Sequence, residues 1–385
     1  MNSLEKADFW LKKLQNLGPV INGVEPTGTW SNEALAGETL ARVCENFKKD
    51  LEGLENEAKF MFSSHVESES LTEQSANLLR KWQVVGAPSL SALCVFALEN
   101  FGIKEPEDFI QAILIASVLG EVENDLAYHN NMHYRKVLFN AVRLIAVHNF
   151  IYNGTARSFD VKQICLLLMG ACAHDIGHDG RGNTIKGVFY QGRLEKLSYD
   201  LALPYFKAVG FVDEEALDDY KMMVLCTEVT PLDDPGNPMN QMKAAYRYHY
   251  LGDKTKTHTL NLDSDIAALE TNAHLTTMCL ILHEADIASS AGITYEVTKF
   301  ETSIYMQEIG TKQARPQHVI DFLNQICQRK FLSDAGQRLF AANLARIYAL
   351  AQQEVEAGDE LYPAPEHADF ILTFAQDGQA PKTIN

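Results

Sequence analysis

Two short histidine clusters are the parts of this chain best suited to chemistry. The first reads Tyr-His-Asn-Asn-Met-His and contains His129 and His133, and the second begins with His174 and Asp175 and continues to His178. Imidazole nitrogens and carboxylate oxygens are ligands with which proteins hold divalent metal ions. The composition of the two clusters therefore predicts a metal site.

The spacing within the first cluster allows its two histidines to share one cavity. His129 and His133 are four residues apart, so on a helix they would project from one face about one turn apart. One of them could bind metal while the other faces a substrate. An isolated pair with this spacing is more often two surface or hydrogen-bonded histidines, and it is the second cluster that favours the metal interpretation.

The second cluster comes after an unusually apolar segment. Residues 161–173 are apolar nearly all round, which predicts a buried helix, and His174 and Asp175 come directly after them. An imidazole and a charged carboxylate at the end of such a helix are costly to desolvate unless they are paired or bind a cation. Metal ligation would remove that cost.

A third candidate ligand, Asp286, lies in another strongly apolar segment, residues 275–287. Taken alone, it could be a helix-terminal aspartate paired with an Arg or Lys. Beside the two clusters it completes a set of two histidines and two aspartates, a set that suits a hard or borderline divalent ion.

The elements that must position these residues are predicted to be helices. Apolar residues recur at three- and four-residue spacing, and alternating apolar stretches are few, so we expect an all-α protein. The clearest helical segments are residues 35–57, 71–84, 90–100 and 106–119. A run of turn residues at 230–238 predicts a loop, and residues 246–258 read as a surface insertion.

These patterns divide the chain into three parts. We expect an N-terminal helical region over residues 1–105, a compact multi-helix domain over 106–375 on which that region packs, and a frayed polar tail over 376–385. With 385 residues, 46% of them hydrophobic, the chain can bury a large core, as one large helical domain or two smaller ones.

Charge and composition restrict the partners. A net charge of -18 argues against nucleic-acid or anionic-membrane surfaces, which need Lys and Arg to neutralise phosphate. The apolar runs are shorter than the ~18 to 20 residues that span a bilayer, and the first residues contain no secretory segment, so we expect a cytoplasmic protein. Seven cysteines without a Cys-x-x-Cys pattern read as reduced core residues.

Three motifs taken together carry a family resemblance. Tyr-His-Asn-x-x-His, then His-Asp-x-x-His-x-Gly-x-x-Asn, then His-x-Ala-Asp in an apolar helix resembles the catalytic domain of the class I cyclic nucleotide phosphodiesterases, within the HD-type metal phosphohydrolases. The resemblance extends in order from about Tyr128 to Phe340, a little over half of the chain. It implies hydrolysis of a small-molecule phosphodiester, most specifically a 3',5'-cyclic nucleotide such as cAMP or cGMP, to a nucleoside 5'-monophosphate.

The resemblance also implies a two-metal site. By position, His133, His174, Asp175 and Asp286 would hold the first ion, usually zinc, and Asp175 would bridge to a second, magnesium or manganese. Hydroxide between two such ions would attack phosphorus. The metals would also supply the local positive field that an acidic chain needs to bind a phosphodiester.

Further residues match by position. His129 resembles the general acid that protonates the leaving oxygen, His178 the histidine that contacts metal-bound waters, and Glu195 the glutamate that orients the acid and water. Thr227 resembles a threonine just outside the ligand set. Glu195 could equally be a helix-surface residue and Thr227 an ordinary helix threonine.

A Gln-x-x-Phe element suggests how the base would be read. In the family the amide hydrogen-bonds the purine and the ring stacks on it, and Gln337 and Phe340 match these positions. Phe340, with Leu344 and Ile347, also reads as plain helix core.

Departures from the family leave two alternatives open. Asp179 occupies a position where the family has proline, the segment between His178 and Glu195 is short, and residues 1–105 match no motif of the family. The alternatives are an HD-type phosphohydrolase for another phosphate ester, such as a nucleotide or cyclic dinucleotide, and an inactive nucleotide-binding module.

Overall fold

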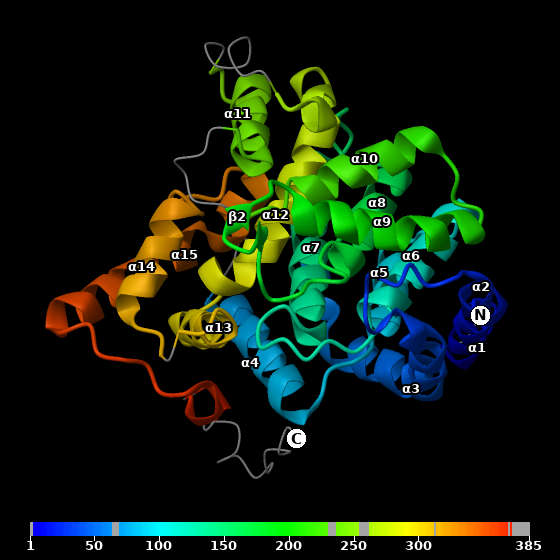
Figure 1. Cartoon of the computed structure of the whole chain (residues 1–385), viewed down its shortest axis with the longest axis horizontal. Helices are drawn as coiled ribbons and strands as arrows, with labels where there is room; N and C mark the ends of the chain where they lie inside the picture. The colour runs from blue at the N-terminus through cyan, green and yellow to red at the C-terminus, as the bar shows by residue number, and fades with distance from the viewer. Residues whose placement is uncertain are drawn as a thin grey trace.

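The expectation of an all-α protein is confirmed. The computed structural model describes residues 3–63, 69–229, 236–253, 262–311, 313–368 and 370–371. These residues form α-helices joined by short loops, and the only sheet among them is one two-stranded hairpin (Figure 1). The predicted tail at 376–385 and most of the predicted loop at 230–238 lie outside the described residues.

The N-terminal part consists of five α-helices. They are α1 (Ser3–Gln15), α2 (Gly18–Gly23), α3 (Ala36–Glu57), α4 (Glu69–Val85) and α5 (Leu90–Phe101), with the short 3-10 helices η1 (Glu33–Leu35) and η2 (Lys59–Phe62) between them. Local signals set their ends: the Ser89 hydroxyl accepts a hydrogen bond from Ala92 N at the start of α5, and Gly102 ends that helix with a positive φ of 72°. The predicted segments 35–57, 71–84 and 90–100 all fall in these helices.

The rest of the chain adds ten α-helices among the described residues. They are α6 (Glu107–Gly120), α7 (Asn131–Ile151), α8 (Val161–Ala173), α9 (Arg193–Ala208), α10 (Glu214–Leu225), α11 (Pro238–Tyr250), α12 (Ala273–Ala291), α13 (Tyr295–Glu308), α14 (Pro316–Gln325) and α15 (Asp334–Ala357), with 3-10 helices η3 (Ser264–Glu270) and η4 (Pro365–His367). Helix α8 has the predicted bounds because Asp160 and Gln163 form a capping box in front of its apolar run.

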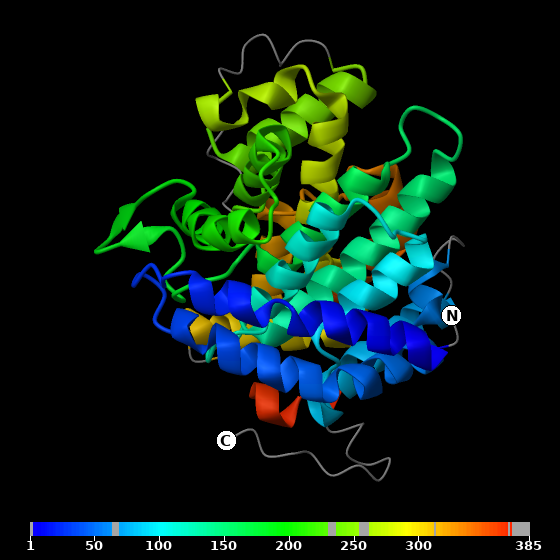
Figure 2. The same ribbon diagram turned by 90° about the vertical axis from the view of Figure 1, so that its right-hand side faces the viewer.

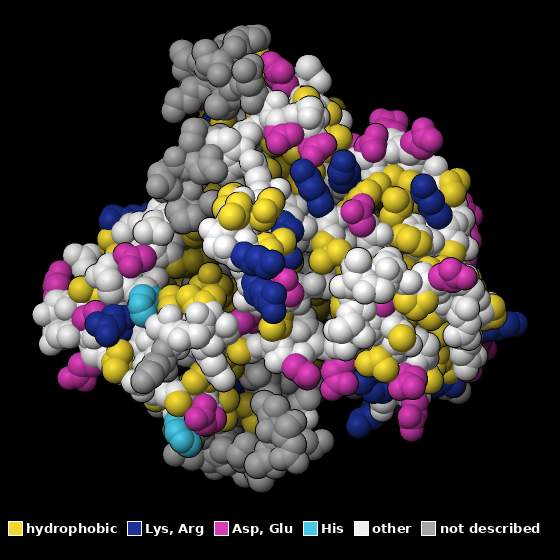
Figure 3. All heavy atoms as spheres, in the orientation of Figure 1, with side chains coloured by type: hydrophobic (Ala, Val, Ile, Leu, Met, Phe, Trp, Pro, Cys, Tyr) yellow, Lys and Arg dark blue, Asp and Glu magenta, His cyan; other side chains and the backbone are white. Residues whose placement is uncertain are grey.

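The hairpin lies between α8 and α9. Strand β1 (Thr184–Ile185) pairs antiparallel with β2 (Val188–Phe189), with Thr184 opposite Phe189 and Ile185 opposite Val188. Its side chains Ile185, Val188 and Phe189 are largely exposed, and yellow apolar side chains stand on the surface where β2 lies (Figure 3). The hairpin therefore projects from the helical body rather than joining its core.

Helices α7, α8 and α12 form the centre of the molecule. Helix α7 packs on both α8 and α12, and α8 also packs on α6 and α12. In α8, Gly170 permits the close approach to α12, because a Cβ there would lie 2.7 Å from Leu282 Cδ2. The packing of these three buried helices brings the first turn of α7 and the end of α8 next to the middle of α12.

The N-terminal helices pack on this centre rather than standing apart from it. Helix α3 contacts α5 and α6, and α5 contacts α6 and α7. The blue N-terminal helices lie against the rest of the body in Figure 2. One hydrophobic core of described residues extends from Ala7 to Phe370. Six of the seven cysteines are buried, Cys44 is half-buried, and all are free thiols. No described helix is long and apolar enough to cross a membrane.

The predicted surface insertion at 246–258 is wrong at its start. Residues 246–250 are the last residues of α11, and Tyr246 is fully buried. Its ring lies next to that of Tyr250, at a centroid distance of 5.0 Å. Aromatic and basic residues that looked like a surface strip therefore belong to an amphipathic helix, and residues 254–258 lie outside the described chain.

One buried histidine far from the clusters makes stability depend on pH. Burial lowers the pKa of His148 from its usual 6.5 to about 4, although its ring nitrogen donates to the carbonyl of Arg157 at 2.8 Å. Because the folded pKa is depressed, the stabilisation is present above pH 6.5 and is lost as the pH falls through 4. We expect His148→Gln to reduce this acid-induced loss by about 3 kcal/mol, measured as urea unfolding free energies at pH 7 and pH 4. An unchanged difference between the two pH values would contradict the assignment.

Candidate metal centre

His133 lies in the first turn of α7, and His129 lies just before that helix. Asn130 is the N-cap, its side chain accepting hydrogen bonds from Met132 N at 2.8 Å and His133 N at 3.3 Å. The expectation that both histidines share one helical face is therefore wrong, because α7 begins after Asn130 and His129 lies before that cap. The two rings still lie close, with centroids 5.5 Å apart.

His174 and Asp175 lie where α8 ends. His174 is the C-cap residue, and its Nδ1 lies 3.2 Å from the carbonyl oxygen of Gly170. A carbonyl can only accept, so Nδ1 carries a proton and Nε2 is the nitrogen that would bind a metal ion. This backbone contact orients the ring, and it selects the tautomer that a metal ligand at Nε2 requires.

Asp286 comes from the middle of α12 and faces both histidines. The His133 Nε2 atom lies 3.1 Å from Asp286 Oδ1 and 3.4 Å from Asp175 Oδ2. The His174 Nε2 atom lies 3.2 Å from Asp175 Oδ2 and 3.7 Å from Asp286 Oδ1. Three elements that are distant in sequence thus place two nitrogens and two oxygens around one point.

These four residues fit a divalent cation. The Nε2 atoms of His133 and His174 are buried and make no directed hydrogen bond, although carboxylate oxygens lie close by. Ligands ~2.1 Å from an ion are ~3.0 to ~3.4 Å apart for octahedral or tetrahedral angles, which is close to the separations observed. A cation bound by all four side chains would hold the histidine nitrogens and the carboxylate oxygens at such separations without hydrogen bonds between them.

Electrostatics of the four residues favour the charged forms of the carboxylates. Burial by itself would raise the pKa values of Asp175 and Asp286, but the neighbouring imidazoles outweigh it and hold both pKa values below their usual range. The side chains of His133 and His174 are at most 3% exposed, whereas those of Asp175 and Asp286 are 12% and 11% exposed. The solvent side of the cluster is therefore the carboxylate side.

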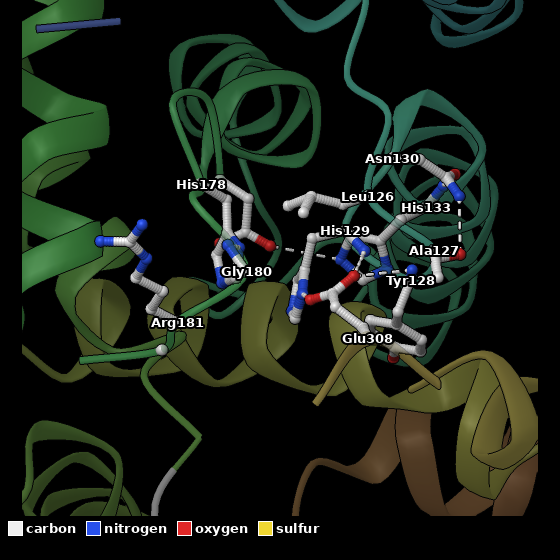
Figure 4. Close-up of polar contacts among 12 residues, drawn as sticks. Leu126, Ala127, Tyr128, His129, Asn130, His133, His178, Gly180, Arg181 and Glu308 are labelled. Carbon is white, nitrogen blue, oxygen red and sulfur yellow. Dashed lines mark hydrogen bonds and ion pairs between the residues drawn. The ribbon is translucent and has the colours of Figure 1, made fainter. Parts of the chain in front are cut away.

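A second cluster adjoins the first and contains His129, His178 and Glu308 (Figure 4). The His129 Nδ1 atom lies 2.5 Å from Glu308 Oε1, and the other carboxylate oxygen accepts from the backbone N–H groups of His129 at 3.0 Å and Tyr128 at 2.7 Å. The rings of His129 and His178 are stacked, with centroids 3.8 Å apart. Glu308, at the end of α13, thus fixes both the backbone and the ring of His129.

Sequence reasoning missed Glu308 and assigned its role to Glu195. The Glu308 carboxylate lies 179 positions beyond His129 in the chain and belongs to no recognisable motif. Although burial opposes ionisation, the bonds from His129 and Tyr128 lower the pKa of Glu308 to about 2. The carboxylate that faces His129 is therefore charged at neutral pH.

Glu195 is bound elsewhere. Its carboxylate accepts a hydrogen bond at 3.0 Å from Asn183, whose amide also donates to Glu228 at 2.8 Å. Burial, with a smaller contribution from Glu228, raises the pKa of Glu195 to about 8. In this arrangement Glu308, and not Glu195, contacts His129, so the expected role of Glu195 in orienting the acid and water stays a prediction.

His178 is neutral in this environment. Burial, followed by the neighbouring His129, lowers the pKa of His178 to about 4. Its Nδ1 accepts a hydrogen bond from Gly180 N at 3.1 Å, so the proton of the neutral ring is on Nε2. Next to it, Asp179 forms a bidentate pair with Arg193 at 2.8 and 3.0 Å, which ties the loop to α9 at the position where the family has proline.

Thr227 is not brought into contact with any candidate ligand. It comes after α10, and its hydroxyl donates to the carbonyl of Val224 at 2.7 Å, an ordinary bond at a helix end. Nothing in its described contacts distinguishes it from a structural threonine.

The two residues predicted to bind a base, Gln337 and Phe340, both make contacts within the protein. Phe340 is completely buried, lies 5.0 Å from the ring of Phe331 and packs so tightly on Gly292 that a Cβ there would collide with it. The expectation that Phe340 stacks on a base is therefore wrong in this conformation, because α15 turns that ring into the core. The Gln337 amide donates to the carbonyl of Phe331.

Comparison with known proteins adds no assignment. No protein-family model matches the chain, and no curated protein matches it. Fold and geometry define an all-α protein with a candidate His/Asp metal centre, and a second histidine cluster paired with a carboxylate lies beside it.

Proposed function

We propose that the chain is a metal-dependent phosphodiesterase, which hydrolyses a 3',5'-cyclic nucleotide to a nucleoside 5'-monophosphate. The observation that carries the proposal is the pairing of two sites: four candidate ligands converge on one point, and a carboxylate-bound imidazole, His129, lies next to them. A metal site alone would suit many proteins. The adjacent proton donor is what favours hydrolysis of an ester.

In this proposal His133, His174, Asp175 and Asp286 hold zinc, and Asp175 also contributes to a second ion, magnesium or manganese. Such ions, when bound, lower the pKa of water and polarise the phosphoryl oxygens. The buried nitrogens of His133 and His174 would then have the partner that they lack in the protein alone. The more exposed carboxylate side is where a phosphate group would enter.

His129 is proposed to protonate the leaving sugar oxygen. Its Nδ1–H is donated to the ionised Glu308, so the proton available for transfer is on Nε2. The contact of Nδ1 with Glu308 and the two backbone bonds to that carboxylate hold the ring in position. An alkoxide is a poor leaving group, and such acid assistance is typically worth ~10² to 10⁴ in rate.

A specific observation favours a second candidate, an HD-type phosphohydrolase for another phosphate ester. Of the pair proposed to recognise a purine, Phe340 is buried and Gln337 is half-buried, with its amide donating to the carbonyl of Phe331. Recognition of a base therefore has less support than the hydrolytic centre. Both candidates use the same metal ligands and the same acid.

The test is a product-resolved screen of the metal-loaded protein. Cyclic mononucleotides, cyclic dinucleotides and nucleoside monophosphates would each be incubated with Mg, Mn or Zn, and products separated by chromatography. We expect a nucleoside 5'-monophosphate from a cyclic mononucleotide. Turnover of another ester alone would select the second candidate, and no turnover with any ester despite bound metal would exclude hydrolysis.

Glu308→Gln tests the pairing that supports the acid. The amide keeps the size of the side chain but removes the charge, so we expect kcat for the best ester to fall roughly 10- to 100-fold with metal content unchanged. The matched control is Glu296→Gln, an exposed change in the first turn of the same helix. Equal rates for the two variants would show that Glu308 does not position the acid.

A further inference from the structure

A separate cavity lies in the N-terminal part of the protein. It has a volume of ≈ 520 Å³, is partly open to solvent and is lined by α3, α4, the loop at 86–89 and the beginning of α7. None of its lining residues belongs to the two histidine clusters. Small-molecule sites typically have volumes of roughly 300 to 1,000 Å³, so this space is large enough for a metabolite of nucleotide size.

The cavity combines an apolar wall with a charged one. Val85, Ala87 and Pro88 supply half-buried apolar surface, whereas Leu54, Leu78 and Trp82 are at most 6% exposed and lie beneath it. Gly53 leaves the space open, since a Cβ at this position would have nothing within 4 Å. An apolar group of a ligand could therefore lie against the half-buried side chains.

The carboxylates of the lining are already engaged. Glu121 accepts from Arg135 at 2.7 and 2.8 Å, and Glu57 pairs with Lys81. Asp50 accepts from the backbone of Ser89 at 2.9 Å. These bonds tie α3 to α4 and to the N-cap of α5, and tie α7 to the end of α6.

Two cations on one face of α3 are not compensated in this way. The Arg42 guanidinium donates only to the backbone carbonyl of Glu121, at 3.0 Å, and no described carboxylate pairs with Lys49. The two residues are seven positions apart, so both project toward the cavity with Asn46 between them. In a chain with a net charge of -18, an uncompensated pair of cations at a cavity is a specific local feature.

We propose that this cavity is a binding site for a small organic anion. The acidic group of the ligand, a phosphate, sulfonate or carboxylate, would lie within reach of Arg42 and Lys49, and its apolar part would pack on Val85, Ala87 and Pro88. The inference does not depend on the proposed hydrolytic function. Its ligand is recognised by residues that the candidate metal centre does not use.

Titration with 1-anilinonaphthalene-8-sulfonate, an aromatic sulfonate whose fluorescence increases in apolar sites, tests the proposal on the full chain. We expect saturable binding at one site. Lys49→Glu should weaken it roughly 10-fold, the effect of one charged hydrogen bond. Gly53→Phe should abolish it by filling the cavity. The control Lys12→Glu makes the same charge change at an exposed position of α1 and should leave the affinity unchanged.

Several outcomes would overturn the proposal. They are absence of saturable binding to the wild type, equal affinities in Lys49→Glu and Lys12→Glu, and loss of binding in Asp286→Ala, which would place the dye at the metal centre instead. Circular dichroism and thermal unfolding establish that each variant is folded. If Gly53→Phe fails to fold, Lys49→Glu, a surface change, decides the question.

Discussion

Asp286→Ala is expected to abolish both metal retention and ester hydrolysis while leaving the helical content close to that of the wild type. The carboxylate faces both candidate imidazole ligands, at 3.1 Å from His133 and 3.7 Å from His174, so its removal breaks the set that encloses the ion. Helix α12 keeps its apolar contacts with α7 and α8 because they are made by other residues. Alanine also favours a helix more than aspartate does.

Three measurements check this result. Metal content after loading with Zn or Mn should fall to near zero, hydrolysis of the best ester should be lost, and circular dichroism should change little. A further readout is thermal unfolding: a ligand at 100 times its Kd stabilises a protein by about 2.7 kcal/mol, and the variant should not respond to metal. The matched control is Asp218→Ala, an exposed aspartate on α10. Full activity in Asp286→Ala would refute the metal centre.

His129→Ala is expected to separate proton donation from metal binding. The imidazole is not among the four ligands proposed for the first ion, so that ion should be retained. The rate for an ester with a poor alkoxide leaving group should fall by ~10² to 10⁴, because no proton reaches the departing oxygen. A p-nitrophenyl ester, whose leaving group needs no proton, should lose much less.

The comparison of the two esters is the decisive measurement. His367→Ala removes an exposed histidine near the C-terminal end of the described chain and should leave both rates unchanged. Similar losses with the two esters in His129→Ala would argue that His129 positions substrate or metal instead of donating a proton. Loss of bound metal in His129→Ala would indicate that His129 is itself a metal ligand.

Much of the fold could be predicted because local signals determine it. The helix at 161–173 has the predicted bounds because a capping box precedes it. Its apolar residues face nearly all directions, so the whole helix must be buried. The same logic selected His174, Asp175 and Asp286, because a polar group beside a long apolar run must find a partner. The structure brings these residues together with His133.

Residues next to helix ends were harder to place. His129 was expected on the helix with His133, but Asn130 caps α7 between them. Spacing alone could not distinguish a residue in the first turn from one just before it, since helix boundaries depend on which side chain takes the cap.

The sequence by itself determined an all-α class, the helices and the polar residues that a buried environment would force to pair. Only the tertiary structure decided which partners they have. Glu308 contacts His129 although the two residues are 179 positions apart in the chain. Phe340 is buried in the core, and Arg42 and Lys49 line a cavity together with residues of α4 and α7. The physical reason is range: caps and periodicity act over a few residues, whereas these contacts depend on how distant helices pack against one another.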